Sequence, residues 1–287
     1  MKNDHSFSII VPAFNEETVI KGALEKIQKI PGNYEIIVVD DGSTDNTYKV
    51  IKDAGVITLR HANNRGYGAS LKTGIKKAKY DTIVITDSDG TYPADRIPEL
   101  VGLFISQDLD MVVGARIGNN VRIPFVRRPA KWLITKLASY LSGTRIPDLN
   151  SGLRVMKKDI INKFMRLLPD GFSFTTTISL AMLTNNYSVK YIPIDYFKRS
   201  GKSKIRPVQD TLNFIQLIIR MVLYFDPLKI FLPLSLPLIV GGFILIFYQA
   251  VFLRDIGTIS VIISLAGVQL LAIGMLADLI DKRSQVD

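Results

Sequence analysis

The sequence predicts an α/β domain followed by a juxtamembrane helix and a hairpin of two membrane-spanning helices. Short β-rich runs alternate with helical patterns over residues 7–113, which is typical of a mostly parallel, Rossmann-like sheet covered by helices. Polar motifs follow the first, second and fourth of these runs. Beyond residue 230, two long segments carry almost no charge. The predicted units are residues 1–205, 206–229 and 230–287.

The first half of the chain contains five candidate strands: Phe7–Val11, Glu35–Val39, Val56–Leu59, Thr82–Thr86 and Met111–Val113. Between the first two, apolar residues from Val19 to Ile27 recur at the helical period, and Asn15 is expected to cap that helix. Similar amphipathic segments lie at about residues 45–54, 67–78 and 94–106. This alternation predicts a doubly wound nucleotide-binding layer, with ligands at the carboxyl ends of the strands.

The second half of the domain has a weaker pattern. Residues 129–194 predict a helix, a loop, a strand near 153–156, two further helices and a strand at 189–194. This half is expected to bind a second substrate, the acceptor. Residues 206–225 predict a helix that Pro207 opens and Asp226-Pro227 ends. Because its polar residues form one narrow stripe, an amphipathic helix in the membrane interface is expected, with an ordinary core helix as the alternative.

Two apolar segments, residues 230–253 and 257–277, are long enough to span a bilayer. A helix rises about 1.5 Å per residue, and the hydrocarbon core is roughly 30 Å thick. Only three residues separate the segments, so a tight antiparallel hairpin is expected, with a buried hairpin of a soluble protein as the alternative. Lys and Arg cluster before the first span and after the second. A multi-pass membrane protein with both termini and the α/β domain in the cytoplasm is therefore expected.

The composition narrows the classes of partner. The 287 residues carry a formal net charge of +10, and the mean hydropathy of +0.22 is unusual for a purely soluble enzyme. Basic residues are spread without an aromatic-rich basic repeat or a zinc pattern, so nucleic acid is not expected as a partner. Anionic lipid and phosphate substrates explain the charge better. The chain has no cysteine, which excludes a disulfide framework and a thiolate metal site, and no cleavable signal is expected.

Asp87-Ser88-Asp89 follows the apolar run of residues 82–86, which delivers two carboxylates to the end of a strand. Hard oxygen ligands at this place suit Mg²⁺ or Mn²⁺ bridging the two phosphates of a nucleotide-sugar. Such a cation would neutralise the charge that develops on a departing diphosphate. A D-x-D tripeptide in an ordinary surface loop is the alternative.

Two further motifs are candidates for donor binding. Asp40 and Asp41 end the second predicted strand, where a carboxylate can accept hydrogen bonds from a base or from ribose hydroxyls. Capping of the next helix by residues 43–45 is a compatible alternative. The segment Asn64–Gly68 is a glycine-bearing loop before a helix, and it can present backbone amides and Arg65 toward a phosphate.

Taken together, four motifs resemble those of family 2 glycosyltransferases: Val11–Glu17, Val38–Asp45, Asn64–Gly68 and Asp87–Pro93. Within that family, residues 6–205 are similar to the dolichol-phosphate mannose synthase and polyprenyl-phosphate glycosyltransferase branch. The resemblance implies a GT-A fold, inversion at the anomeric carbon and a divalent metal. It also implies a nucleotide-sugar donor and a polyprenyl phosphate acceptor.

The motifs and the resemblance together define a predicted donor site. Its nucleotide-sugar-binding residues are Pro12, Ala13, Phe14, Glu16, Asp40, Asp41, Arg65, Ser88, Arg199 and Lys204. Its metal-binding residues are Asp87, Asp89 and Thr91. Thr91 departs from the family pattern, because the mannose synthases usually carry an amide or another strong ligand there. Metal affinity or donor identity is expected to differ accordingly.

The acceptor side has basic signals of its own. Arg116 ends a strand, Arg127 and Arg128 open a helix, and Lys131 follows one turn on. These four residues are predicted to bind the acceptor phosphate through charge-assisted hydrogen bonds, with solvated surface arginine as the alternative. The segment Asp148–Arg154 resembles the acceptor region of the family.

A basic loop, Lys198–Lys204, precedes the predicted interfacial helix. It is similar to the R-x-G-x-S-K loop of the family, and it is expected to close over the donor diphosphate. A patch that binds anionic lipid is the alternative.

The predicted reaction is the inverting transfer of one hexose from GDP-mannose or a UDP-hexose to a polyprenyl (dolichyl-type) phosphate. A phosphate monoester has a second pKa of about 6, so the nucleophile is already ionised and needs no strong base. Asp87, Asp89 and Arg116 are expected to act catalytically through positioning and electrostatics. His5 and His61 are expected to have structural roles.

Two other functions stay open on the sequence alone. A processive polysaccharide synthase usually carries a Q-x-x-R-W element, and Trp132 has no such setting. An inactive membrane-tethered scaffold that binds nucleotide-sugars is the other alternative. The sugar, the nucleotide base, the lipid and a homo-oligomer formed through the hairpin also stay open.

Overall fold

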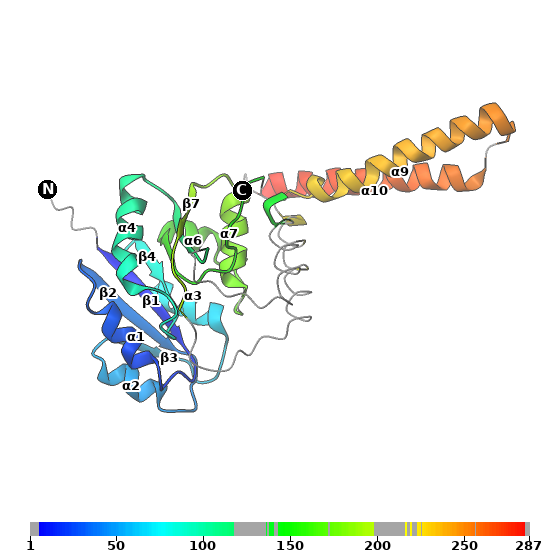
Figure 1. The fold of residues 1–287 in the computed structure, drawn as a ribbon. Coiled ribbons are helices and arrows are strands. Elements are labelled where there is room, and N and C mark those ends of the chain that lie inside the picture. The colour runs from blue at the N-terminus through cyan, green and yellow to red at the C-terminus, as the bar shows by residue number, and fades with distance from the viewer. Residues whose placement is uncertain are drawn as a thin grey trace. The chain divides into compact units, whose positions relative to one another are not determined.

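The computed structural model describes residues 6–117, 143–171, 173–197, 226–255 and 257–284, together with positions 136, 138–140, 216, 219, 223 and 224. The chain divides into two compact units, residues 1–215 and 216–287, and each is described by itself. Figure 1 shows the sheet and helices of the first unit and the two long helices of the second. The predicted helix at residues 206–225 lies outside the described residues, apart from four single positions.

A sheet forms the centre of the first unit. Within the described residues it has seven strands in the order β3-β2-β1-β4-β6-β5-β7. The strands are β1 (Phe7–Ala13), β2 (Tyr34–Asp40), β3 (Ile57–Arg60), β4 (Thr82–Ile85), β5 (Met111–Ala115), β6 (Arg154–Lys157) and β7 (Val189–Pro193). Strand β6 runs antiparallel to β4 and β5, and the other pairs are parallel. The predicted mostly parallel sheet is confirmed.

Helices cover the two faces of this sheet (Figure 1). The helices of the first unit are α1 (Ile20–Ile27), α2 (Thr47–Asp53), α3 (Tyr67–Lys77), α4 (Ile97–Ser106), α6 (Lys158–Phe164) and α7 (Phe174–Thr184), and a 3-10 turn (Ala94–Arg96) precedes α4. Buried residues of α1, α2 and α4 share one apolar cluster with alternate residues of the central strands. Helix α3 packs on the opposite face, against β1 and β2.

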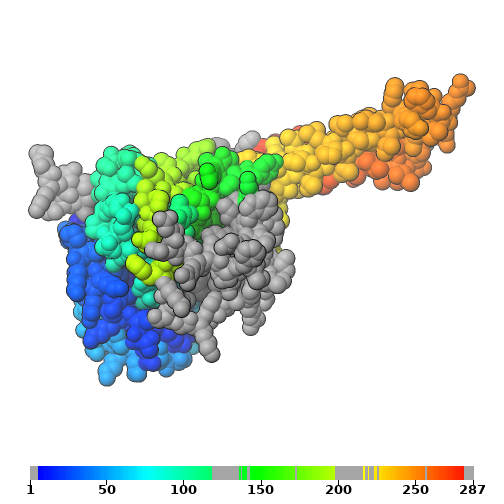
Figure 2. Space-filling view, in the orientation of Figure 1, coloured from blue at the N-terminus to red at the C-terminus, as the bar shows by residue number. Residues whose placement is uncertain are grey.

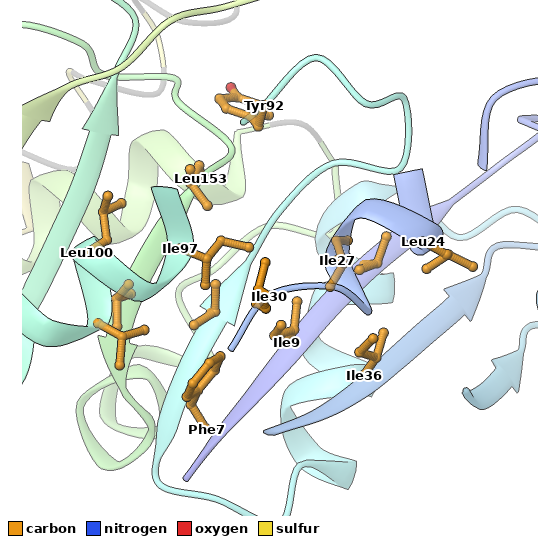
Figure 3. Packing of buried hydrophobic residues seen from close by; sticks show 14 of the residues in the cluster. Phe7, Ile9, Leu24, Ile27, Ile30, Ile36, Tyr92, Ile97, Leu100 and Leu153 are labelled. Atoms are coloured by element: carbon orange, nitrogen blue, oxygen red, sulfur yellow. The ribbon is translucent and has the colours of Figure 1, made fainter. Parts of the chain in front are cut away.

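The alternation of side chains along β1 separates the two layers. Phe7 and Ile9 belong to the cluster with α1 and α4, where Figure 3 shows them beside Ile27 and Ile97. Ile10 points the other way and meets α3 at Gly74, where an added Cβ would overlap its side chain. Burying each large apolar side chain contributes about 1.5–3 kcal/mol, so both layers hold β1 in place.

The expected capping of the first helix by Asn15 is wrong. Helix α1 starts at Ile20 after Val19, and no side chain caps it. Asn15 instead has a φ of 55°, and its Oδ1 accepts hydrogen bonds from the Thr44 amide (2.9 Å) and hydroxyl (3.3 Å). The Asn15 side chain joins two loops by hydrogen bonds, because the segment after β1 runs beside the segment after β2.

The second unit is a helical hairpin. Helix α9 (Leu228–Tyr248) continues into a π-helical turn (Gln249–Leu253), and α10 (Thr258–Ser284) follows. Two described helical stretches, Leu228–Leu253 and Thr258–Ile280, are long and apolar enough to cross a membrane. Their large side chains are widely exposed, with Phe247 and Phe252 each at 68%, and Figure 2 shows the hairpin as one rod of side chains. This exposure argues against a hairpin buried in a soluble core.

Small residues bring the two helices together. Gly242 lies against Ser264, Gly267 against Ile239 and Gly274 against Phe231, so closely that a Cβ on any of these glycines would overlap its neighbour. Close backbone approach matters here because packing, rather than hydrophobic burial, drives helix association in lipid. At the turn, Gln249 Oε1 accepts hydrogen bonds from the Gly257 amide (2.9 Å) and the Ser260 hydroxyl (2.7 Å).

Replacing Gly242 by leucine is expected to weaken the hairpin. The new side chain would push α9 away from Ser264, and overpacking of this kind costs about 1–3 kcal/mol. Thermal unfolding in detergent should show a lower melting temperature for Gly242→Leu. Gly241→Leu is the matched control, because an added Cβ at Gly241 meets nothing within 4 Å. Equal melting temperatures for the two variants would contradict the packing described.

Candidate active site

Carboxyl ends of strands meet along one edge of the sheet, called here the ligand edge. Ala13 lies opposite Asp40 where β1 pairs with β2, and Ile10 lies opposite Ile85 where β1 pairs with β4. Because β6 is antiparallel, its first residue, Arg154, lies opposite Ile85. The ligand edge therefore gathers the segments that follow β1, β2, β4 and β5 and the segment that precedes β6. Three of the four family motifs, Val11–Glu17, Val38–Asp45 and Asp87–Pro93, lie there together with Asp148–Arg154.

Hydrogen bonds join the loops after β1 and β2. The Asn15 amide donates to Ser43 Oγ (3.0 Å), and the Glu16 amide donates to Thr47 Oγ1 (2.8 Å). Ser43, one of the predicted helix caps, thus contacts the loop after β1. The two loops therefore form one wall of the ligand edge. Of the predicted donor-binding residues, Pro12 and Ala13 end β1 and are buried, and Phe14 and Glu16 lie in the first loop and are partly exposed.

Both carboxylate oxygens of Asp41 contact the protein itself. His61 Nδ1 lies 2.7 Å from Oδ1, and the Arg65 and Gly66 amides donate to Oδ1 (2.9 Å) and Oδ2 (2.8 Å). His61 Nε2 lies 2.9 Å from Thr73 Oγ1 of α3. Asp41 thus anchors the loop that leads to α3. His61 completes that anchor, which fits its expected structural role.

Asp40 is fully buried beside Asp41. Arg60 Nε lies 3.0 Å from Asp40 Oδ2, and the Ser43 amide donates to Asp40 Oδ1 (3.2 Å). The Arg60 guanidinium lies over the Tyr48 ring, 4.5 Å from its centroid. Asp40 therefore fixes the turn after β2. Direct contact of Asp40 and Asp41 with a nucleotide stays a prediction.

Two backbone amides of the glycine-bearing loop, those of Arg65 and Gly66, donate to a protein carboxylate and not to a phosphate. Contact of the other amides of this loop with a phosphate stays a prediction. The Arg65 and Gly66 amides bind Asp41, and the Ala69 amide donates to the Asp170 carbonyl (3.0 Å). The start of α3 needs these acceptors because the first amides of a helix have no intrahelical partner. The Arg65 side chain is exposed, so its predicted contact with the donor is unaffected.

The Asp87 carboxylate is enclosed by two groups from other segments. Tyr67 Oη donates to Asp87 Oδ1 (2.9 Å). On another side lies Gly152, where an added Cβ would stand 2.7 Å from Oδ1 and 2.8 Å from Oδ2. Burial, together with the Asp87 charge, raises the pKa of Tyr67 well above its ordinary value, so the phenol stays protonated as a donor. Asp87 is half-buried and held in one place.

Asp89 is oriented by a residue of its own loop. Thr91 Oγ1 donates to Asp89 Oδ1 (2.6 Å), and the Thr91 amide donates to the same oxygen (3.1 Å). Ser88, between the two aspartates, is buried. The Thr91 hydroxyl, at the position where the family usually has a stronger metal ligand, thus contacts the Asp89 carboxylate. Its contact with a metal stays a prediction.

The residues at this place fit a divalent metal that arrives with its substrate. Asp87 and Asp89 supply hard carboxylate oxygens, and within the described residues no group of three or more His, Cys, Asp or Glu could hold a metal. Mg²⁺ is often bound by one or two carboxylates, with substrate phosphates and water completing its shell. Two strand-end carboxylates meet that requirement.

Arg116, at the end of β5, is held by Asp148. Its Nε donates to Asp148 Oδ2 (2.7 Å), its Nη2 donates to Oδ1 (2.9 Å), and its own amide donates to Oδ2 (2.9 Å). The guanidinium also lies over the Tyr196 ring, 5.2 Å from its centroid. Although burial alone would lower it, the hydrogen bonds to Asp148 raise the pKa of Arg116, so the group stays charged. Arg116 is therefore a fixed cation at the ligand edge.

A buried arginine supports the turn that contacts Asp87. Arg154 is 0% exposed, and it donates to the Ser151 carbonyl (2.8 Å), the Leu149 carbonyl (2.9 Å) and Ser179 Oγ (2.6 Å). The Gly152 amide in the same turn donates to the Tyr92 hydroxyl (2.6 Å). Burial lowers the pKa of Arg154 below its ordinary value. These bonds fix the turn, so Gly152 is held against the metal motif.

Several predicted residues lie outside the described part of the chain. They are the acceptor-side residues Arg127, Arg128 and Lys131, and Arg199 and Lys204 of the basic loop. The segment before that loop is described: the Phe197 amide donates to the Thr91 carbonyl (2.9 Å), and Tyr196 contacts Tyr92 edge to face. The described chain that precedes the basic loop, up to Phe197, thus lies beside the metal motif. Sequence reasoning did not find the roles of Tyr67, Tyr196 and Gly152, because nothing local marks a contact between distant segments.

Comparison with known proteins agrees with this arrangement. Residues 8–165 match the model of glycosyl transferase family 2, and residues 226–282 match the model of the GtrB C-terminal hairpin. Among solved structures, glucosyl-3-phosphoglycerate synthase from Mycobacterium tuberculosis, in complex with Mn²⁺, uridine diphosphate and glucosyl-3-phosphoglycerate, has a TM-score of 0.62 at 20% identity. The match covers 77% of this chain and 81% of that one, and it concerns the fold.

Two relatives show the same likeness in sequence. An uncharacterized protein of Methanocaldococcus jannaschii is 31% identical, over 67% of this chain and 82% of its own length. Dolichyl-phosphate hexose transferase of Haloferax volcanii is 27% identical, over 70% of this chain and 86% of its own. The family model spans more than half of the chain, and its motifs lie along one edge of a GT-A sheet. The chain therefore belongs to glycosyl transferase family 2 and is a glycosyltransferase.

Proposed function

We propose that this glycosyltransferase moves one hexose, with inversion, from a nucleotide-sugar to a polyprenyl phosphate of the dolichyl type at a membrane surface. The observation that carries the proposal is the pair of oriented carboxylates, Asp87 and Asp89, at the ligand edge of a chain that also has a membrane hairpin. The name of the Haloferax volcanii relative supports a lipid phosphate acceptor. The donor is GDP-mannose or a UDP-hexose.

The reaction is a single displacement at the anomeric carbon. An oxygen of the lipid phosphate forms the new bond to this carbon while the bond from the carbon to the diphosphate breaks, and the nucleoside diphosphate leaves. The attacking phosphate is already largely ionised at neutral pH, so no residue has to remove a proton. In agreement with a mechanism that needs no base, both oxygens of the Asp148 carboxylate accept hydrogen bonds from Arg116.

On the donor side, Asp87 and Asp89 would hold Mg²⁺ or Mn²⁺, which supplies Lewis-acid stabilisation of the departing diphosphate. The wall formed by the loops after β1 and β2 belongs to the same edge of the sheet as these carboxylates and would hold the nucleoside. Arg65, Arg199 and Lys204 would bind the diphosphate.

On the acceptor side, Arg116 would bind the lipid phosphate, because Asp148 and Tyr196 hold its guanidinium in one orientation. Its partial neutralisation by Asp148 explains why further cations are needed. Arg127, Arg128 and Lys131 would supply them. The hairpin would keep this site at the bilayer surface, and the excess of Lys and Arg at both ends of the spans supports cytoplasmic termini.

The test is a transfer assay with a panel of donors. The purified full-length protein in detergent would be incubated with Mn²⁺, a polyprenyl phosphate and radiolabelled GDP-mannose, UDP-glucose, UDP-galactose or UDP-N-acetylglucosamine. Label should enter the lipid phase with one donor and should require the phosphate, so that the matching polyprenol stays unlabelled. Label in a growing polymer would indicate a processive synthase. No transfer from any donor, with nucleotide binding intact, would indicate a scaffold.

A further inference from the structure

Tyr67 lies in the glycine-bearing segment that the sequence assigned to phosphate binding, yet its hydroxyl reaches the metal motif. Tyr67 is the first residue of α3, and its Oη donates to Asp87 Oδ1 (2.9 Å). The amides on either side of it, those of Gly66 and Ala69, bind Asp41 and the Asp170 carbonyl. The segment therefore presents a phenol to the metal motif.

The glycines that flank Tyr67 fix its place. At Gly66, which has a φ of 104°, an added Cβ would overlap the Asp170 carbonyl, and at Gly68 it would overlap the Pro169 carbonyl. The first turn of α3 consequently lies directly against the backbone of residues 169–171. Lys72 strengthens this contact, since its Nζ donates to Asp170 Oδ1 (2.7 Å). The two glycines thus allow the backbone on both sides of Tyr67 to pack closely against residues 169–171, which fixes the position of the tyrosine.

On its other side the Asp87 carboxylate meets Gly152. Two hydrogen bonds fix the turn that carries Gly152: Arg154 donates to the Ser151 carbonyl (2.8 Å), and the Gly152 amide donates to the Tyr92 hydroxyl (2.6 Å). Asp87 is therefore held between a hydroxyl donor and a backbone surface. The backbone limits how far the carboxylate can turn, and the hydroxyl selects one orientation.

We propose that Tyr67 is a positioning residue that orients the Asp87 carboxylate toward the metal ion of the metal–nucleoside diphosphate complex, which rests on the proposed function of Asp87 as a metal ligand. Groups that hydrogen-bond to a ligating side chain orient it, and their loss typically lowers metal affinity or activity about 10- to 100-fold. Tyr67 meets this description because its hydroxyl donates to the Asp87 carboxylate, which the proposed function assigns to the metal.

The test measures metal binding without any transfer reaction. Mn²⁺ would be titrated into the full-length protein with UDP and, separately, with GDP, and free Mn²⁺ would be counted by its electron paramagnetic resonance signal. Tyr67→Phe keeps the ring and removes the hydroxyl, so the fold should persist. We expect its Mn²⁺ affinity in the presence of the nucleotide to fall about 10- to 100-fold. The concentration of Mn²⁺ that half-activates transfer should rise by a similar factor.

Tyr34→Phe is the matched control. Tyr34 also uses its hydroxyl inside the domain, donating to the Ile27 and Ile30 carbonyls at 3.0 Å each, but it lies away from the ligand edge. Unchanged Mn²⁺ affinity in Tyr67→Phe, or an equal loss in Tyr34→Phe, would overturn the positioning role while leaving the proposed function in place. If the unmodified protein bound no Mn²⁺ with either nucleotide, the proposed function would fail as well.

Discussion

Gly152→Ala is expected to lower sugar transfer about 100-fold or more while the catalytic domain stays folded. An added Cβ would stand 2.7 Å from Asp87 Oδ1 and 2.8 Å from Oδ2, closer than such atoms approach, so the carboxylate has to move. A displacement of about 1 Å at a catalytic group can cost about 100-fold in rate. The measurement is the initial rate of label transfer to lipid, with circular dichroism to confirm folding.

Gly22→Ala serves as the control for this change. Gly22 lies within α1, and an added Cβ there meets nothing within 4 Å. Alanine in a helix interior is favoured over glycine by about 0.5–1 kcal/mol, so this variant should keep full activity and gain slight stability. A Gly152→Ala enzyme as active as Gly22→Ala would show that Asp87 does not depend on close contact with the turn before β6.

Asp87→Asn is expected to lower transfer on the order of 1,000-fold. The amide has nearly the shape of the carboxylate and can still accept the Tyr67 hydrogen bond, but it loses the negative charge that a divalent cation needs. Stabilisation of a departing diphosphate by a metal is worth several kcal/mol, and each 1.36 kcal/mol changes a rate tenfold. Rates should be compared at saturating donor and Mn²⁺.

Asp95→Asn is the control for the loss of a carboxylate. Asp95 is exposed in the 3-10 turn before α4, six residues beyond Asp89 in the sequence. None of the contacts described above for the ligand edge involves Asp95. Its variant should transfer sugar at the unmodified rate. Transfer by Asp87→Asn at more than about a tenth of that rate would be incompatible with a metal ligand at position 87.

The succession of strands and helices along the chain was predictable because each element carries its own sequence pattern. The continuous apolar run of β1 and the helical period of α1 depend only on neighbours along the chain; β1 is buried throughout, and the apolar positions of α1 are buried. The antiparallel insertion of β6 between β4 and β5 was not predicted, because strand order is set by long-range pairing. The two long apolar helices were predictable, because their length and lack of charge are visible in the sequence.

Within the site, the motifs located the ligand edge but did not give the partners of their residues. Asn15 was taken for a helix cap, yet it bonds to Thr44 in another loop. The glycine-bearing loop predicts amides that face a phosphate, yet Asp41 accepts the hydrogen bonds of the Arg65 and Gly66 amides. In both cases the local pattern was compatible with two partners, and only the tertiary fold selects one.

Roles that act through a third residue left no mark in the sequence. Arg154 resembled part of an acceptor motif, but it is fully buried and supports the turn at Gly152. Asp148, in the same motif, is the partner that orients Arg116. Such roles depend on two contacts at once, so they become visible only when the segments before β6 and after β5 are seen together.

The most direct test of the central claim, that two strand-end carboxylates act on the donor through a divalent cation, is transfer before and after metal removal. The full-length protein would be treated with EDTA, transferred to metal-free buffer and assayed with its labelled donor and polyprenyl phosphate. Transfer should stop after this treatment and return on addition of Mn²⁺ or Mg²⁺, but not of Na⁺ at equal ionic strength. Undiminished transfer in metal-free buffer would contradict the claim.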